Sequence, residues 1–426
     1  MAAPDFDVIV VGGGPGGSTA AALARKHQLR VLVVEKEKFP RFHIGESLLP
    51  MGNAILRETG AWERIAAEGF IKKHGAIFET GTGREILEIK FREGIVPGLE
   101  FAYQVERARF DQLLLDHARG LGAEVREETA ARELQSGGGV HRLRLESARG
   151  TEWVTAPWVI DATGRENLLS TAQKRELDPP RLEKKIAIYS HFTGIPRLPG
   201  EAAGHTIAVR LDRGWFWFIP IDAERTSAGL VAPISALRGA ENNPEEAFRQ
   251  AVAGSSRLRE FFAAARPAMP FRVTSDYSYF RKDLADERLL LVGDAAGFFD
   301  PIFSSGVYMS MWSACLAVGL MQRARAAGRG LTAGERRRYS RKVKGHARVF
   351  EQLIKAFYDN HAFAVFMCQK VPWSLGPGIY SIVAGHAVLT WPIWWRFQVF
   401  RTVCWIQRFH ALCPPIDYRD PAAAAV

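Results

Sequence analysis

The chain has 426 residues, 47% of them hydrophobic, and 56 Lys and Arg residues against 46 Asp and Glu residues give a formal net charge of +10. This composition suits a globular protein with a large core in two or three lobes, and its four cysteines lack the spacing and density of a disulfide scaffold. The charge favours anionic ligands, an acidic partner domain or a membrane surface, whereas no motif predicts a nucleic acid partner or a metal site. We expect a cytoplasmic protein without a signal peptide.

The first predicted elements form a nucleotide-binding turn. The β-branched stretch Val8–Val11 predicts a buried strand, and the Ala-rich stretch 19–25 predicts a helix. Between them, a GxGxxG pattern places glycines at Gly12, Gly14 and Gly17. Such glycines permit the tight turn, the close approach of the backbone to a pyrophosphate and close packing of the helix, whose N-terminus then faces the phosphates.

A second strand is predicted over residues 30–34 and ends at Glu35. An acidic residue about 20 positions after such a turn can accept hydrogen bonds from ribose hydroxyls. Strand, turn, helix and acid together predict a bound dinucleotide. The turn by itself leaves NAD and FAD both open.

Two short segments follow that carry polar side chains. Residues 45–50 read GESLLP and include Glu46 and Ser47. Residues 69–78 read GFIKKHGAIF and include Lys72 and Lys73, beside the strand-like stretches 76–78 and 86–91. A lysine taken alone usually faces solvent, so Lys72 and Lys73 by themselves do not predict a catalytic role.

The middle of the chain alternates helical and strand-like stretches. Residues 104–111 include Arg107, residues 159–164 read VIDATG, and the run SGGG at 136–139 predicts the turn of a hairpin. Strands are then predicted over 186–192, 206–211 and 215–219. In the last of these, Trp215 and Trp217 lie two residues apart and therefore share a face, although aromatic residues at this period can simply fill a core.

Near residue 290 the chain carries another apolar strand and a polar loop. The strand 289–292 runs into Asp294, and residues 300–306 then read DPIFSSG. This loop includes Phe303, Ser305 and Gly306. A concave run of backbone N–H groups at such a loop would suit an anion.

The tail from residue 349 onward is helical and aromatic in character. Residues 371–395 contain no Asp, Glu, Lys or Arg and are long enough to cross a bilayer, but prolines and glycines interrupt them. Helices packed over a cavity, a membrane-associating surface and a membrane span therefore all stay open. Each of them fits a lipophilic ligand.

Several of these segments resemble the flavoprotein monooxygenase superfamily. Gly293 and Asp294 resemble its GD motif, in which the Asp binds the ribityl chain of FAD. The segment with Arg107 is similar to the helix of this superfamily that contacts the flavin. Residues 159–164 resemble its ATG strand end. The resemblance implies FAD as the dinucleotide.

The implied architecture is an α/β fold in which a Rossmann-like FAD-binding lobe is interleaved with a β-sheet lobe on the substrate side, as in aromatic hydroxylases. We expect the FAD-binding lobe at 1–70, 104–184 and 281–330, and the substrate-side sheet lobe at 71–103 and 185–280. Residues 331–426 are expected to form a helical, aromatic-rich C-terminal region.

Three segments resemble flavin-dependent halogenases more specifically. The sequence GWFWFIP at 214–220 is similar to their WxWxIP motif, and the segment with Lys73 resembles the one that carries their essential lysine. The segment with Glu46 and Ser47, and the loop 300–306, match segments that line the flavin ring and the halide site. The chain is therefore identified as resembling the flavin-dependent halogenases.

The resemblance implies a sequence of events. FADH2 and O2 give a flavin hydroperoxide, and chloride or bromide held near Ser305 and Gly306 attacks it to form hypohalous acid. Lys73 then hydrogen-bonds that acid or becomes a haloamine before an electron-rich ring attacks, since a buried lysine readily becomes a nucleophilic amine. Trp215 and Trp217 would separate the flavin from the substrate.

One departure from the family pattern narrows the substrate, and the number of dinucleotide fingerprints implies a partner. Tryptophan-type halogenases carry an acidic residue immediately before the serine pair, where this chain has Phe303. This implies a phenolic or pyrrolic ring, free or tethered to an acidic acyl or peptidyl carrier protein. The sequence contains a single dinucleotide fingerprint, so a separate flavin reductase is expected to supply FADH2.

Other functions of the same fold stay open from the residues alone. A single-component hydroxylase or epoxidase would form product without halide. A reductase of isoprenoid chains would turn over without oxygen. A flavin-binding protein without enzymatic activity would do neither.

Overall fold

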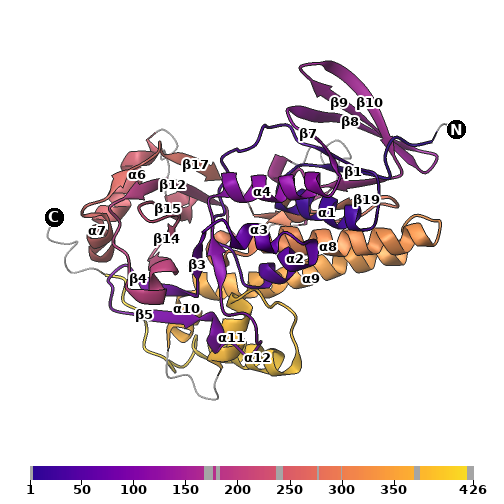
Figure 1. The fold of residues 1–426 in the computed structure, drawn as a ribbon. Coiled ribbons are helices and arrows are strands. Elements are labelled where there is room, and N and C mark those ends of the chain that lie inside the picture. The colour runs from indigo at the N-terminus through magenta and orange to yellow at the C-terminus, as the bar shows by residue number, and fades with distance from the viewer. Residues whose placement is uncertain are drawn as a thin grey trace.

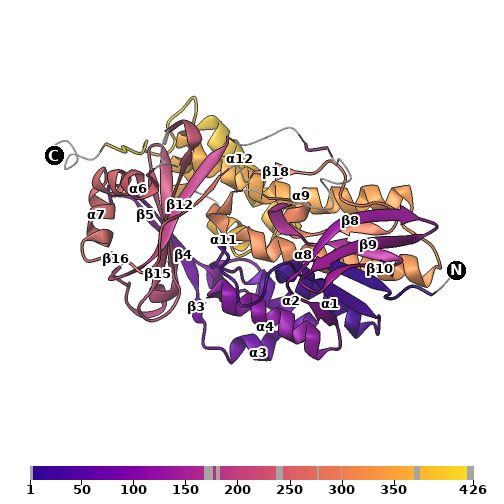
Figure 2. The ribbon, with the colours of Figure 1, turned by 90° about the horizontal axis from the view of Figure 1, so that it is seen from above.

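The computed structural model describes residues 3–166, 176–178, 183–236, 243–275, 278–298, 300–368 and 375–419. Figures 1 and 2 show one lobe built around β1 and a second lobe built around β12–β15, with the long helices α8 and α9 running along the first. The α/β class predicted from the sequence is confirmed.

The first lobe contains a parallel five-stranded sheet in the order β19-β11-β1-β2-β7. Its strands are β1 (Val8–Val11), β2 (Val31–Val34), β7 (Glu124–Arg126), β11 (Trp158–Asp161) and β19 (Leu289–Leu291). The helices of this lobe are α1 (Pro15–Lys26), α2 (Met51–Thr59), α3 (Trp62–Ala66), α4 (Arg107–Gly120) and α8 (Ser305–Ala326). All residues of β1 and β2 are buried, as a parallel sheet covered on both faces requires.

A three-stranded antiparallel sheet extends from this lobe. It consists of β8 (Thr129–Gly137), β9 (Val140–Ser147) and β10 (Gly150–Ala156). The predicted hairpin turn joins β8 to β9, and Gly138 and Gly139 both have positive φ there.

The second lobe is a mixed sheet in the order β16-β12-β15-β14-β13-β4-β5, with β17 also paired to β12. Its strands are β4 (Gly75–Thr80), β5 (Ile86–Lys90), β12 (Lys185–Thr193), β13 (Thr206–Leu211), β14 (Gly214–Pro220), β15 (Thr226–Pro233), β16 (Arg266–Pro267) and β17 (Arg272–Ser275). Strand β13 runs parallel to β4, which joins two distant parts of the chain in one sheet.

The faces of this sheet contact different partners because side chains alternate along each strand. Phe216 and Phe218 pack with residues of α6 (Pro244–Ala253) and α7 (Ser256–Phe262). Trp215 and Trp217 point to the opposite face, into the core that also holds apolar residues of the C-terminal helices.

Two short strand pairs complete the sheets. Strand β3 (Ile71–Lys73) pairs with β6 (Ala102–Gln104), and β18 (Tyr279–Phe280) pairs with β20 (Gly297–Phe298). The first pair carries Lys73.

The C-terminal region consists of α9 (Ala333–Tyr358), α10 (Asn360–Met367), α11 (Gly376–Val383) and α12 (Trp391–Ile406). A capping box of Thr332 and Glu335 begins α9, and Gly385, with φ of +102°, follows the end of α11. Within the described ranges, none of the helices combines the length and apolarity needed to cross a bilayer. The uncharged stretch 371–395 is therefore divided, with α11 and the start of α12 in its described part and residues 371–374 outside the described residues.

Candidate active site

The glycines of the nucleotide turn are required by its geometry. Gly12 has φ of +106°, in the region that favours glycine, and a Cβ on Gly17 would lie 1.8 Å from the carbonyl oxygen of Gly12. Helix α1 begins at Pro15, directly after this turn. At Gly14, by contrast, a Cβ would meet only a guanidinium nitrogen of Arg41, at 3.5 Å. The approach to the N-terminus of α1 is therefore open on the Gly14 side.

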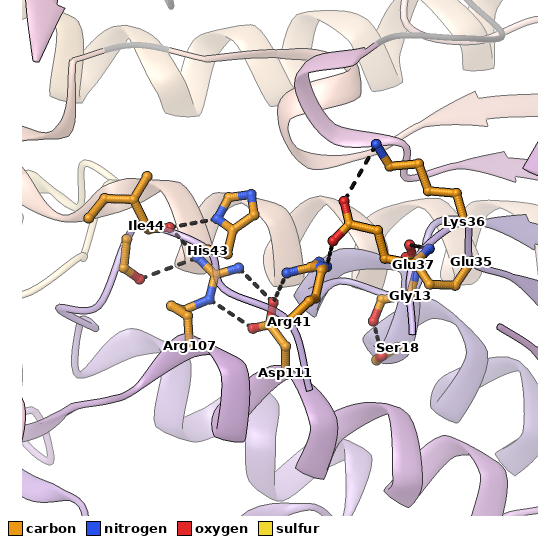
Figure 3. A network of polar contacts seen from close by, with 11 residues as sticks. Gly13, Ser18, Glu35, Lys36, Glu37, Arg41, His43, Ile44, Arg107 and Asp111 are labelled. Carbon is orange, nitrogen blue, oxygen red and sulfur yellow. Dashed lines mark hydrogen bonds and ion pairs between the residues drawn. The ribbon is translucent and has the colours of Figure 1, made fainter. Parts of the chain in front are cut away.

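Glu35 shapes this turn directly. One of its carboxylate oxygens accepts a hydrogen bond from the backbone N–H of Gly13 at 2.7 Å, and the other accepts from the N–H of Glu37 at 2.9 Å (Figure 3). No local pattern of residues marks the contact between Glu35 and Gly13. The bond to ribose hydroxyls stays a prediction for the same side chain.

Arg107 is held in a buried ion-pair network. Its guanidinium donates two hydrogen bonds to Asp111, at 2.8 and 2.9 Å, and one to the carbonyl oxygen of Ile44 at 2.7 Å (Figure 3). Arg41 approaches the same Asp111 carboxylate at 3.2 Å. Arg107 thus fixes the backbone just ahead of Glu46 and Ser47, while its direct contact with flavin stays a prediction.

Glu46 links the two lobes. Its Oε1 lies 2.6 Å from Nε2 of His191 on β12, and both side chains are buried. The backbone of the same segment is anchored as well, because the N–H of Val105 donates to the carbonyl oxygen of Glu46 at 2.7 Å. The Gly45–Ser47 segment is consequently fixed from both sides.

Lys73 is buried, whereas Lys72 beside it is exposed. The Lys73 side chain is 2% exposed, and its Nζ donates to Oγ of Ser47 at 2.8 Å and to the carbonyl oxygen of Leu48 at 3.3 Å. Burial lowers the pKa of Lys73 to about 7, because no carboxylate is among its hydrogen-bond partners. A substantial fraction of this amine is neutral near pH 7.

A polar cluster surrounds the Ser47 hydroxyl. Oγ of Ser47 lies 2.9 Å from Oγ1 of Thr206, which also accepts a hydrogen bond from Nε2 of Gln104 at 2.9 Å. His205, which directly precedes Thr206 in the chain, is 2% exposed, and burial lowers its pKa to about 4. The described groups around Lys73 are thus neutral, and none of them stabilises an ammonium by opposite charge.

The two tryptophans of the WxWxIP motif share one face of β14, as predicted. Their ring centroids lie 6.0 Å apart, and both indoles are buried. Nε1 of Trp217 donates to Ser227, and the residue opposite Trp217 on β15 is Gly229. A Cβ on Gly229 would lie 2.3 Å from the indole, so this glycine makes room for the ring.

The loop 300–306 forms a turn of backbone donors at a helix N-terminus. A short 3-10 turn, Pro301–Phe303, is followed by Ser304 with φ of +56°, and α8 begins at Ser305. No side chain caps this helix. The backbone N–H groups of the first turn, including those of Ser305 and Gly306, are those that an α-helix leaves without an intrahelical partner.

Phe303 lies in an aromatic cluster. Its ring centroid is 5.8 Å from that of Phe78 and 6.3 Å from those of Phe357 and Phe366, and Phe303 is 2% exposed. Phe357 and Phe366 come from α9 and α10. The C-terminal helices therefore contribute to the surroundings of the loop 300–306.

Sequence reasoning missed a buried polar network beside this loop. Nε1 of Trp215 donates to the hydroxyl of Tyr358 at 2.7 Å, and that hydroxyl donates to Oδ2 of Asp300 at 2.7 Å. Nζ of Lys185 lies 3.5 Å from the same oxygen. Burial raises the pKa of Asp300, and Lys185 and Tyr358 oppose that shift. Asp300 belongs to the DPIFSSG segment, but no local pattern marks Lys185 or Tyr358.

The chain has groups that fit FAD. Burial raises the pKa of Asp294 to about 6, and no described residue donates a hydrogen bond to its carboxylate. Hydroxyls of a bound ribityl chain would supply the missing donors. The open approach at Gly14 and the uncapped N-terminus of α1 likewise suit a pyrophosphate.

Comparison with solved structures shows which class of proteins shares this fold. The chain matches a flavoprotein/dehydrogenase from Cytophaga hutchinsonii with a TM-score of 0.87 and 28% identity, covering 95% of this chain and 99% of that one. It matches a myxobacterial chondrochloren halogenase with a TM-score of 0.78 and 29% identity, covering 97% and 99%. The fold is that of a flavoprotein.

Sequence comparisons then define the family. A family model described as tryptophan halogenase matches residues 7–88 and 82–363. The chain is 35% identical to the 1H-pyrrole-2-carbonyl peptidyl-carrier-protein chlorinase of Pseudomonas fluorescens, covering 75% of this chain and 76% of the relative. It is 30% identical to tryptophan 2-halogenase of Chondromyces crocatus, covering 83% and 68%. The chain belongs to the tryptophan halogenase family and is a flavin-dependent halogenase that uses FAD and a halide ion.

Proposed function

We propose that this halogenase transfers halogen from Lys73 to an electron-rich phenolic or pyrrolic ring. The observation that carries the proposal is the environment of Lys73, which is buried, hydrogen-bonded to neutral oxygens and has a pKa near 7. An amine in this state is available as a nucleophile at neutral pH.

The chemistry divides between the cofactor and the chain. Bound reduced FAD supplies, with O2, the oxidising equivalent that converts halide to hypohalous acid. The Lys73 amine attacks the halogen of that acid, so an N–X bond forms, the O–X bond breaks and water leaves. The ring then attacks the halogen, a C–X bond forms, the N–X bond breaks, and the ring proton returns to the amine.

Backbone groups of the loop 300–306 would hold the halide. The N–H groups of Ser305 and Gly306 belong to the first turn of α8, where the helix dipole favours an anion. Trp215 and Trp217 would separate the flavin from the substrate, so that oxygen is delivered to halide and not to carbon.

We infer that Gly12, Gly14 and Gly17 hold the pyrophosphate, that Glu35 and Asp294 bind ribose and ribityl hydroxyls, and that Arg107, Glu46 and Ser47 line the flavin. The open cradle at Gly14 and the Asp294 carboxylate without a donor support this assignment.

The proposed ring needs no carboxylate to assist its attack. Phe303 stands where tryptophan-type halogenases carry an acid, and the phenylalanines around it form an environment in which a carboxylate would be costly. Phenols and pyrroles are activated enough to react without that help. A relative's name specifies pyrrole-2-carbonyl on a peptidyl carrier protein, and the net charge of +10 suits an acidic carrier. We therefore favour a carrier-tethered substrate.

A separate flavin reductase would supply FADH2, because the sequence holds a single dinucleotide fingerprint.

The test is mass spectrometry of an aerobic reaction with FAD, a generic flavin reductase, NADH and bromide, using a panel of free and carrier-tethered phenols and pyrroles and a hypohalite trap. Lys73→Ala should form no brominated ring product while still generating trapped hypobromite. Lys72→Ala is the matched control, because that lysine is exposed on the same strand, and it should keep the activity.

Three results would redirect the assignment. Brominated product formed by Lys73→Ala removes the lysine from the mechanism. Hypobromite without ring product from wild-type enzyme rejects the substrate panel. Oxygenated product that does not depend on bromide points to a hydroxylase.

A further inference from the structure

Helix α12 and the turn after it present an exposed apolar surface. Of the ten large apolar side chains that are exposed in the described part of the chain, six lie between residues 388 and 412. We call these six the aromatic face: Val388, Trp391, Trp394, Trp405, Phe409 and Leu412. Trp391 is 71% exposed and Phe409 is 66% exposed. Such a concentration of exposed apolar side chains marks a binding surface.

Helix α12 is apolar on two sides. Its inner side buries Ile393, Phe397, Phe400 and Cys404 against the core of the C-terminal region. Its outer side carries Trp391, Trp394 and Trp405 beside the polar residues Arg401 and Thr402, whereas a surface helix ordinarily carries mainly polar residues there. Figures 1 and 2 show α12 at the periphery of the molecule. Within the described part of the chain, these three indoles are therefore left exposed to solvent.

The segment that carries the aromatic face contains basic but no acidic residues. The sequence contains no Asp or Glu from residue 360 to residue 416. Arg401 and Arg408 are both exposed there. Arg408 pairs with Asp359 at 2.7 Å, whereas Arg401 donates to the neutral amide of Gln398 at 3.0 Å and keeps its charge uncompensated in that contact. This arrangement complements an anionic surface.

The aromatic face extends along the length of α12. Trp391 and Trp405 are fourteen residues apart on one helix, which corresponds to about 21 Å along its axis. Trp391 stacks on Trp394, and Trp405 contacts Phe409 edge to face, each pair with ring centroids 5.3 Å apart. Indoles favour the boundary between acyl chains and headgroups, where the ring is in an apolar layer and its N–H reaches polar groups.

We propose that the aromatic face binds the surface of an anionic phospholipid bilayer, with α12 lying in the plane of the interface. The absence of a spanning helix among the described residues is consistent with a peripheral mode of binding. The inner side of α12 shares its hydrophobic core with Phe303 and Trp215. Binding in this way would bring the lobe that carries the candidate substrate side close to the bilayer. The proposal is independent of the catalytic assignment of Lys73.

The test is cosedimentation of the full-length protein with vesicles of phosphatidylcholine alone and of phosphatidylcholine mixed with phosphatidylglycerol. Wild type should bind the mixed vesicles more strongly, and added salt should weaken that binding. The triple variant Trp391→Ser, Trp405→Ser, Phe409→Ser should lower the partition coefficient on the order of tenfold or more, because it removes three interfacial rings. Arg401→Gln should reduce only the preference for the anionic lipid.

Val273→Ser is the matched control, since Val273 is an exposed apolar residue on β17, away from α12. It should bind vesicles as wild type does. Circular dichroism of each variant confirms that it is folded. Failure of wild type to bind mixed vesicles overturns the proposal. So does sedimentation velocity showing a dimer that only the triple variant dissociates, because a second copy would then cover the face. Binding to an acidic carrier protein without vesicle binding overturns it as well.

Discussion

Replacing Lys73 by Met tests whether the buried amine is neutral in the folded protein. Lysine has a pKa of 10.5 when unperturbed, and burial lowers that of Lys73 to about 7. Between these two values the unfolded chain holds a proton on this side chain that the folded chain has lost. The free energy of unfolding of the wild type must therefore rise with pH over this window, relative to a variant without the amine.

The size of the effect follows from the two pKa values. Each unit of difference between the two pKa values corresponds to about 1.4 kcal/mol, and the full gain in stability is reached only above the unfolded pKa. From pH 6 to pH 9, the free energy of unfolding of wild type should increase by about 2–3 kcal/mol relative to Lys73→Met. Methionine is suited to the comparison because it is a flexible, unbranched side chain that fills similar space.

The assay is urea unfolding followed by tryptophan fluorescence at a series of pH values for wild type, Lys73→Met and Lys72→Met. The exposed Lys72 provides the control, and its substitution should leave the pH dependence unchanged. A constant difference between wild type and Lys73→Met from pH 6 to pH 9 would refute the reasoning. Lys73 would then stay an ammonium in the folded protein, and the proposed N–X step would lose its nucleophile.

Further predictions concern the pH dependence of halogenation, the FAD-binding turn, the polar network at Asp300 and the packing of Trp217 against Gly229. Ring halogenation should rise with pH with a midpoint near 7, because the reactive form of Lys73 is the amine, and a pH profile under saturating FADH2 measures this. Gly14→Val should remove FAD binding in fluorescence titrations while leaving the circular dichroism spectrum unchanged, because its side chain would occupy the open approach to α1. Tyr358→Phe should cost about 1–3 kcal/mol in urea unfolding, since it removes the hydroxyl donor to Oδ2 of the buried Asp300 and leaves the Trp215 indole N–H without its acceptor. Gly229→Ala should destabilise the protein by about 1–3 kcal/mol in the same assay, because its Cβ would overlap the indole on the facing strand; an unchanged midpoint for either variant would contradict the packing described.

Local features of the sequence predicted the parts of the site that depend on local structure. The strand, glycine turn and helix at residues 8–26 form one continuous unit, and a GxGxxG turn fits few other conformations. The shared face of Trp215 and Trp217 follows from the period of a strand alone. The bounds of β13 and the turn between β8 and β9 were also predictable, because an apolar strand pattern and a run of glycines are both local features of the sequence.

The sequence by itself therefore determined the fold class, the nucleotide turn and the family, because the motifs that indicate them lie in contiguous segments of the chain. Only the tertiary structure decided that Lys73 and not Lys72 is buried, and that Lys185 and Tyr358 meet at Asp300. The contacts at Asp300 join residues more than fifty positions apart in sequence, with Lys185 on β12 and Tyr358 at the end of α9. Burial and the resulting pKa shifts depend on everything packed around a group, and no local pattern of residues encodes that environment.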